Sequence, residues 1–154
     1  MKTIKNVILA IALFSSSIIF AQNVEPVGSD KIANGGYDFV AYFTDNKALK
    51  GKKEFTHEIN GVKYQFASAE HKNLFKSSPE KYLPACDGYC AFGVAELATK
   101  VPVNPETFKV VDNKLYLFFN GDFKGKPLNT LVEWNKKESD LLTQLPTKWA
   151  TLKK

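Results

Sequence analysis

The sequence contains no arginine, so all 21 of its basic residues are lysines. Proteins that read nucleic acids rely heavily on arginine, because its planar guanidinium group binds bases and phosphates through paired hydrogen bonds. The lysines are also spread along the chain, and 16 acidic residues leave a formal net charge of only +5. We therefore expect a solvated lysine surface and no nucleic-acid partner.

Cysteine is equally scarce, since Cys86 and Cys90 are the only two in the chain. Two cysteines exclude a small scaffold held together by many disulfides. No heptad or glycine period is present, which excludes coiled-coil and collagen-like classes, and no internal repeat is visible. The 154 residues, 13% of them aromatic, fit one globular domain.

Sequence signatures of common catalytic sites are missing as well. The chain has no P-loop and no dinucleotide-binding glycine pattern. The spacing Cys-x-x-x-Cys differs from the Cys-x-x-Cys of thiol oxidoreductases. A Cys90–His71 pair would lack an identifiable orienting acid and oxyanion hole. We therefore expect a protein that is not an enzyme.

Residues 1–21 have the pattern of a secretory signal peptide. Lys2 and Lys5 precede an apolar run from Val7 to Phe14, three serines follow, and Ala21 is a suitable cleavage point. The serines leave the apolar run too short to cross about 30 Å of hydrocarbon securely. We predict a periplasmic or secreted mature chain that starts at Gln22, with no stable membrane anchor.

The strongest local pattern predicts a β-hairpin. Phe55–Ile59 and Val62–Phe66 alternate in polarity around Asn60-Gly61, the preferred pair for a two-residue type I′ turn. This turn sets Phe55, His57 and Ile59 opposite Phe66, Tyr64 and Val62, in that order. All six side chains then share one apolar face.

The remaining patterns predict short helices and a second hairpin. Ser68 is a suitable N-cap for a helix that carries His71, Leu74 and Phe75 on its apolar stripe. A helix over 87–97 would place Cys86 and Cys90 on one side. The other predicted elements are a hairpin of Phe108–Val111 with Leu115–Phe119, and helices over 128–138 and 139–152.

These elements predict a single α+β domain, a small antiparallel sheet of hairpins packed against several short helices. Its expected boundaries are an N-terminal linker over 22–35 and a domain over 36–154 that ends in a helical extension. The stretch Leu115–Phe119 is apolar on both faces, so we expect a central strand or part of an interface there.

Several ordered blocks of this sequence match a known pattern. They are Gly36-Tyr37-Asp38-Phe39-Val40-Ala41-Tyr42-Phe43, Phe66-Ala67-Ser68-Ala69-Glu70-His71, Pro79-Glu80-Lys81-Tyr82 and Gly88-Tyr89-Cys90-Ala91-Phe92. Together they resemble the exported YHS-domain proteins from about residue 36 to residue 119. In the wider YHS/TRASH superfamily, metal-binding members carry cysteines that imply copper or heavy-metal handling. Here Ala41, Ala67 and His71 stand at those cysteine positions, so only His71 could inherit a ligand role.

The two cysteines leave three interpretations open. In an exported protein they are expected to form a short-loop disulfide, although their spacing in a regular helix is near the upper limit for one. As thiolates they would suit Cu(I) or Zn(II). They could also be two inert buried thiols.

Both histidines are expected to face inward, His57 from the first hairpin and His71 from the helix after it. Each could be a packed histidine, but together with Cys90 and Cys86 they are candidate ligands for one metal ion. The sequence therefore predicts an exported, non-enzymatic YHS-domain protein that binds a soft transition metal, copper first, for metal handling or tolerance. The alternative is a metal-free structural module, stabilised by a Cys86–Cys90 disulfide, that binds a small ligand or a protein.

Overall fold

The computed structural model describes residues 28–153, so the predicted signal peptide lies outside the described residues. Within that range, no helix has the length and apolar character needed to cross a membrane. The structured chain begins before residue 36. Ile32 forms a parallel bridge with Lys63, and Ala33 and Asn34 are buried.

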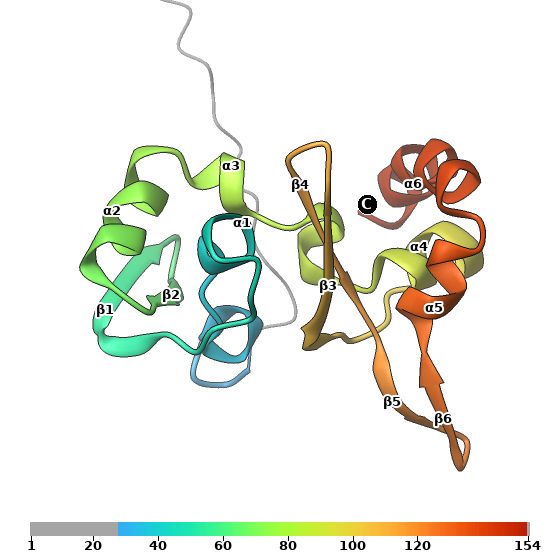
Figure 1. The fold of residues 1–154 in the computed structure, drawn as a ribbon, viewed down its shortest axis with the longest axis horizontal. Coiled ribbons are helices and arrows are strands. Elements are labelled where there is room, and N and C mark those ends of the chain that lie inside the picture. Colours follow the sequence, from blue (N-terminus) through green and yellow to red (C-terminus); the bar gives the residue numbers. More distant parts are fainter. Residues whose placement is uncertain (1–27, 154) are drawn as a thin grey trace, which may run out of the picture.

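The described residues alternate short helices with hairpins (Figure 1). In chain order the elements are η1 (Ala33–Gly36), α1 (Ala41–Thr44), β1 (Lys52–Ile59), β2 (Val62–Phe66), α2 (Ala69–Ser77), α3 (Pro79–Tyr82), η2 (Ala85–Gly88), α4 (Ala91–Leu97), β3 (Asn104–Val111), β4 (Lys114–Phe118), β5 (Asn120–Phe123), β6 (Lys126–Asn129), α5 (Thr130–Asn135) and α6 (Glu138–Leu152). The predicted single α+β domain is confirmed. Its strands form three separate two-stranded antiparallel sheets, so the hairpins do not join into one sheet as expected.

Turn chemistry determines both of the predicted hairpins. Asn60 and Gly61 have φ values of 51° and 77°, and Asp112 and Asn113 have values of 49° and 57°. A type I′ turn needs positive φ at both central residues, which glycine and asparagine adopt most easily. The pairs Ile59–Val62 and His57–Tyr64 form as predicted.

The expected pairing of Phe55 with Phe66 is wrong. Phe66 pairs with Lys52, because the register of β1 shifts between Lys52 and Thr56. Extra residues in one strand of an antiparallel pair interrupt the ladder and bend that strand. Phe55 is left outside the regular pairing, although it still packs against the core.

The chain contains an internal structural repeat that the sequence analysis missed. Each position in η1, α1 and the β1–β2 hairpin has a counterpart 52 residues later (33 to 85, 66 to 118). The register shift between Lys52 and Thr56 recurs between Asn104 and Phe108. Because the same irregularity recurs at the same spacing, we treat 33–67 and 85–119 as two copies of one unit.

Few residue identities mark the two copies. They share a glycine at the end of the 3-10 turn and the tyrosine that follows it, at Gly36-Tyr37 and Gly88-Tyr89. Gly36 and Gly88 both have positive φ, 79° and 92°, which glycine tolerates without steric cost. The next residue differs between the copies, since it is Asp38 in the first and Cys90 in the second.

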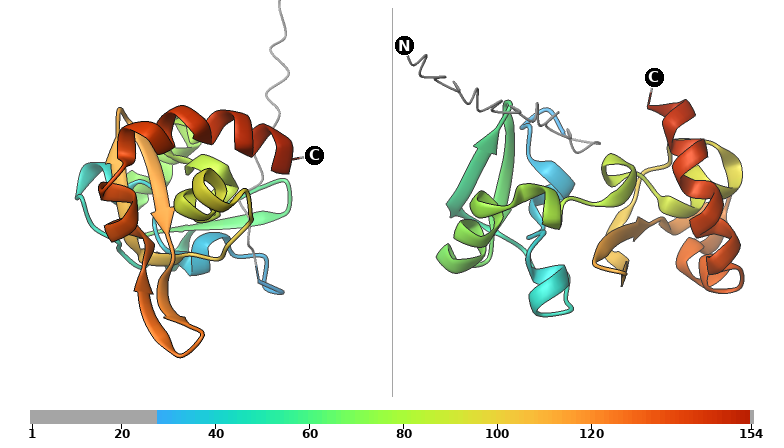
Figure 2. Two further views of the ribbon diagram at one scale, coloured as in Figure 1. Left: turned by 90° about the vertical axis from the view of Figure 1, so that its right-hand side faces the viewer. Right: turned by 90° about the horizontal axis from the view of Figure 1, so that it is seen from above.

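The β3–β4 hairpin lies between two hydrophobic clusters (Figures 1 and 2). Leu115 and Leu117 project into the first cluster with Phe66 and Phe75. Phe118, also on β4, packs with Trp134 in the second cluster. The run over 115–119 was expected to form a central strand or part of an interface. It is not a central strand, because β4 pairs only with β3, but Leu115, Leu117 and Phe118 are buried in the two clusters.

The β1–β2 hairpin has no such second apolar face. Leu115 and Leu117 correspond to Lys63 and Gln65 in the first copy. The Lys63 side chain is exposed and Gln65 is only partly buried, whereas both leucines are fully buried. The two copies of one backbone thus differ in whether the second face of the hairpin is also apolar, and that difference lets the second copy dock on the first.

We predict that Leu115→Ala lowers the free energy of unfolding by about 2–5 kcal/mol, because it leaves a cavity where the two halves meet. The matched control is Lys63→Ala at the equivalent position, where we expect a change within about 0.5 kcal/mol. Urea unfolding of both variants measures the difference. If both variants lost the same free energy of unfolding, the Leu115 face of β3–β4 would not hold the two halves together.

Candidate functional site

Asp38 is a fully buried carboxylate at the start of the α1 segment. Its Oδ1 accepts hydrogen bonds from the backbone N–H groups of Val40 at 2.8 Å and Ala41 at 3.3 Å. Its Oδ2 accepts a third from the N–H of Ala67 at 2.8 Å, directly after β2. The carboxylate thus joins α1 to the end of the first hairpin, and these donors compensate the cost of burying it.

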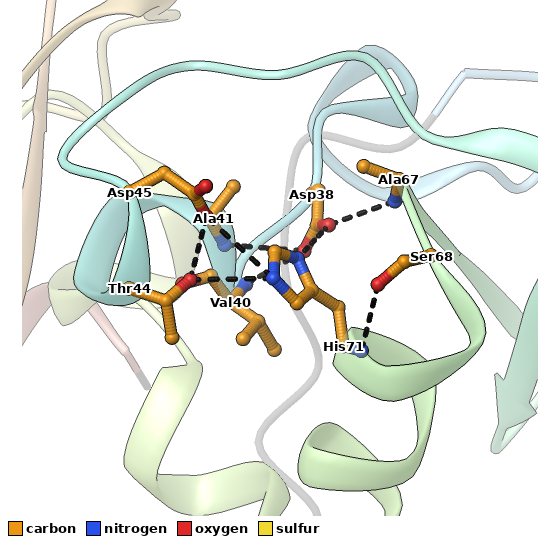
Figure 3. A network of polar contacts seen from close by, with 8 residues as sticks. All are labelled: Asp38, Val40, Ala41, Thr44, Asp45, Ala67, Ser68 and His71. Atoms are coloured by element: carbon orange, nitrogen blue, oxygen red, sulfur yellow. Dashed lines mark hydrogen bonds and ion pairs between the residues drawn. The ribbon is translucent and has the colours of Figure 1, made fainter.

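His71 supplies the fourth hydrogen bond to Asp38 (Figure 3). The N-cap residue Ser68 starts α2 as predicted, accepting a hydrogen bond from the N–H of His71 at 3.1 Å. This places the imidazole Nδ1 2.7 Å from Asp38 Oδ2. Because the carboxylate is an acceptor, Nδ1 carries the proton and donates it to Asp38.

The other ring nitrogen of His71 faces a second carboxylate. Nε2 lies 3.5 Å from Asp45 Oδ2 and 3.4 Å from Thr44 Oγ1, and 14% of the His71 side chain is exposed. Thr44 has a single hydroxyl hydrogen, and its nearest acceptor is Asp45 Oδ2 at 2.7 Å. In a neutral imidazole, the Nε2 lone pair therefore faces the Asp45 carboxylate, with no donor between the two acceptors.

Cys90 takes the position of Asp38 in the second copy. Its fully buried Sγ accepts hydrogen bonds from the N–H groups of Gly93 at 3.4 Å and Phe119 at 3.3 Å. Gly93 is the counterpart of Ala41 and Phe119 is the counterpart of Ala67, so the thiol repeats two of the carboxylate's three backbone links. Thr130 Oγ1, 3.3 Å from Sγ, lies where the first copy has the His71 imidazole.

The expected helix over 87–97 is only partly present, and it does not align the two cysteines. Cys86 lies in η2 with a left-handed φ of 56°, and Cys90 is the N-cap of α4. Asp87 also has positive φ, so the backbone between the cysteines is not helical. The two cysteines are not bonded to each other in this structure and both are buried, and burial, then the nearby Asp87, raises the pKa of Cys86 to about 12.

His57 lies on the hairpin face predicted for it, but away from polar partners. Its ring meets that of Phe75 edge-on at 6.5 Å. Burial, followed by the charges of Lys76 and Lys72, lowers the pKa of His57 below its usual 6.5. We therefore expect a neutral, packed histidine at neutral pH. Leu74, expected on the same inward stripe as His71, is instead exposed.

The four predicted metal ligands are not brought together in the described part of the chain. His71 lies in α2, directly after the first copy, and bonds Asp38, whereas Cys90 and Cys86 lie in the second copy. Across residues 28–153, no group of three or more His, Cys, Asp or Glu side chains is arranged to hold a metal ion. The sequence pattern singled out His71 but gave no specific reason to choose Asp38 or Asp45 as its partner. One signal for Asp38 was present in the sequence. Asp38 directly follows Gly36-Tyr37, just as Cys90 directly follows Gly88-Tyr89.

Compared with known proteins, the chain matches no family model, no curated protein and no solved structure.

We predict that Asp38→Ala lowers the free energy of unfolding by roughly 2–5 kcal/mol, because it leaves three backbone N–H groups without their acceptor. The matched control is Asp45→Ala, which removes a carboxylate that is 39% exposed. For the control we expect a loss within about 1 kcal/mol. Chemical denaturation measures both, and a mild effect of Asp38→Ala would show that Asp38 does not hold the first copy together.

Thiol labelling tests the state of the two cysteines. We expect neither thiol of the folded protein to react with a thiol reagent at pH 7.5, since both are buried and the Cys86 pKa lies near 12. Unfolding in guanidinium should release two reactive thiols. A Ser77→Cys variant, with its new thiol on the exposed end of α2, is the positive control. Two reactive thiols in the folded state would contradict their burial, and none after unfolding would indicate a disulfide.

Proposed function

We propose that this chain is an exported, non-enzymatic YHS-like protein that binds one transition-metal ion, copper first, at His71. The observation that supports this is the approach of His71 Nε2 to Asp45 Oδ2 at 3.5 Å. Two acceptors at this distance repel one another unless a hydrogen-bond donor or a cation lies between them. A metal ion bound by both atoms would be such a cation.

The surroundings of His71 favour a metal ion. Histidines that bind metals commonly donate their other ring N–H to a carboxylate, which fixes the tautomer and makes the free nitrogen more basic. Asp38 provides that carboxylate at 2.7 Å and is itself held by three backbone donors. An imidazole that needs no reorientation loses little entropy on binding a metal.

The donor set indicates which ion fits. Imidazole nitrogen with carboxylate oxygen suits Cu(II) and Zn(II), and Cu(II) forms the more stable complexes. The thiol ligands expected for Cu(I) do not enter the proposed site, because Cys90 is held by its own hydrogen bonds and Cys86 is buried. With His71 and Asp45 as the protein ligands, water completes the coordination, so a metal-handling protein that exchanges its ion readily fits better than one with a permanent structural metal.

Hydrogen bonding of Thr44 supports a non-enzymatic role. Asp38, His71 and Thr44 are arranged as an acid, an imidazole and a hydroxyl, the order found in hydrolases that use a nucleophile. Such a nucleophile must give its proton to the imidazole. The Thr44 hydroxyl lies closer to Asp45, at 2.7 Å, than to His71 Nε2, at 3.4 Å. Its hydrogen is thus directed away from the base.

Metal titration of the tag-free mature protein tests the proposal. At pH 7.5 we expect one equivalent of Cu(II) to bind, with Zn(II) weaker, and His71→Ala to abolish binding. Asp38→Asn, which keeps an acceptor but removes the charge, should weaken binding by about 10–100-fold. His57→Ala is the control for the other histidine and should bind as the unmodified protein does.

Two results would contradict the metal site: equal Cu(II) affinity of His71→Ala and the parent, or no binding at all. Absence of binding would show that His71 and Asp45 do not form a metal site. The metal-free interaction module would then be the better interpretation, and the mass of the intact protein would test its disulfide. A mass lower by two hydrogens than that of the dithiol protein would establish the Cys86–Cys90 bond.

A further inference from the structure

The second copy is followed by a segment that has no counterpart after the first. After the first copy, Ala67 is followed at once by Ser68, the N-cap of α2. After the second copy, the β5–β6 hairpin over residues 120–129 lies between Phe119 and the start of α5 at Thr130. The hairpin projects away from the rest of the molecule, and the base of the hairpin lies near α5 (Figure 1). Asn129 at its end caps α5 by accepting a hydrogen bond from the N–H of Leu131 at 3.0 Å.

This added hairpin forms one wall of a cavity of about 110 Å³. Phe123 and Leu128 contribute from the hairpin, Phe92 and Leu97 from α4, and Cys90 and Thr130 from the floor. The exposed lining is apolar throughout. The cavity therefore lies where the β5–β6 hairpin meets Cys90, the residue equivalent to Asp38.

The two polar side chains at the floor have their hydrogen bonds within the protein. Cys90 Sγ accepts from two backbone N–H groups. The Thr130 hydroxyl lies 3.3 Å from Sγ and donates to the carbonyl oxygen of Phe119 at 2.9 Å. A water molecule in a cavity needs two to four polar partners, and these groups are already engaged. The cavity is thus poorly suited to water.

Large apolar side chains also surround its mouth. Four large hydrophobic residues are strongly exposed in the described chain, and two of them, Leu97 at 61% and Phe123 at 53%, line this cavity. Leu97 comes from α4 and Phe123 comes from β5. A guest that enters the cavity would cover part of both and remove apolar surface from water.

We propose that this cavity binds a small, uncharged, apolar molecule, of about the size of one aromatic ring or a short branched alkyl group. A dry cavity of about 150 Å³ lined by aliphatic and aromatic side chains is known to bind benzene. The cavity here is smaller, about 110 Å³, so a guest of one ring would fill it and extend toward its mouth. The lining offers no ion-pair partner, so charged compounds of the same size are excluded by desolvation. No lining residue belongs to the His71 site, so the two proposals stand or fall separately.

Toluene and benzoate are the test probes, since they are similar in size but differ in charge. The full mature protein, labelled with ¹⁵N, is titrated with each while its amide resonances are recorded. We expect toluene to cause saturable shifts centred on the amides of Gly93, Phe119 and Thr130. Benzoate should cause none. No saturable shift with toluene, shifts centred elsewhere, or equal binding of benzoate would each overturn the proposal.

A pair of surface variants tests the location without disturbing the core. Leu97→Asp places a charge at the mouth of the cavity and should weaken toluene binding at least tenfold. Val132→Asp is the matched control, because Val132 is 52% exposed on α5 and does not line the cavity. Toluene should bind this control as it binds the parent. Equal affinity of the two variants would show that the guest does not use this cavity.

Discussion

Burial of the β3–β4 hairpin on both faces is the constraint on which the rest of the structure depends. One face of β4 places Leu115 and Leu117 in the first hydrophobic cluster, and Phe118 packs with Trp134 in the second. Neither half of the molecule is large enough to bury a sizeable core alone, because small chains leave much of their surface in water. Sharing one hairpin lets each half use the other's apolar surface. The equivalent β1–β2 hairpin keeps Lys63 outward, so its second face offers no apolar surface on which a further copy could dock.

The same backbone position does different chemistry in the two copies. A carboxylate at Asp38 accepts from three backbone N–H groups and still has an oxygen edge for His71, so it orients an imidazole at the surface. The thiol at Cys90 accepts from two N–H groups and meets only the Thr130 hydroxyl. It is a weaker and less polar acceptor, so the second copy can enclose an apolar cavity at that point. The repeated fold thus holds a polar site in one half and an apolar one in the other.

Local rules predicted the elements well and the register less well. Asn60-Gly61 and Ser68 were sufficient for a hairpin turn and a helix start, because a two-residue turn and an N-cap act over a few neighbouring residues. The sequence wrongly predicted that Phe55 pairs with Phe66, because an alternating pattern of polar and apolar residues does not reveal a β-bulge. The helical stripe expected for Cys86 and Cys90 failed because Cys86 and Asp87 adopt positive φ, which non-glycine side chains rarely do. The repeat went unseen because its copies share a backbone and few side chains.

By itself, the sequence determined the turns, the caps, the α+β class and the presence of an apolar strand at 115–119, because each depends on the chemistry of adjacent residues. Only the tertiary structure decided which titratable groups meet. Asp38 and His71 are distant in sequence, and they lie 2.7 Å apart because α1, the end of β2 and α2 converge on one buried carboxylate. From the sequence alone, His57, Cys86 and Cys90 were equally plausible partners of His71. Contacts between distant residues follow from packing, in which the whole core takes part, and a single residue pattern does not specify them.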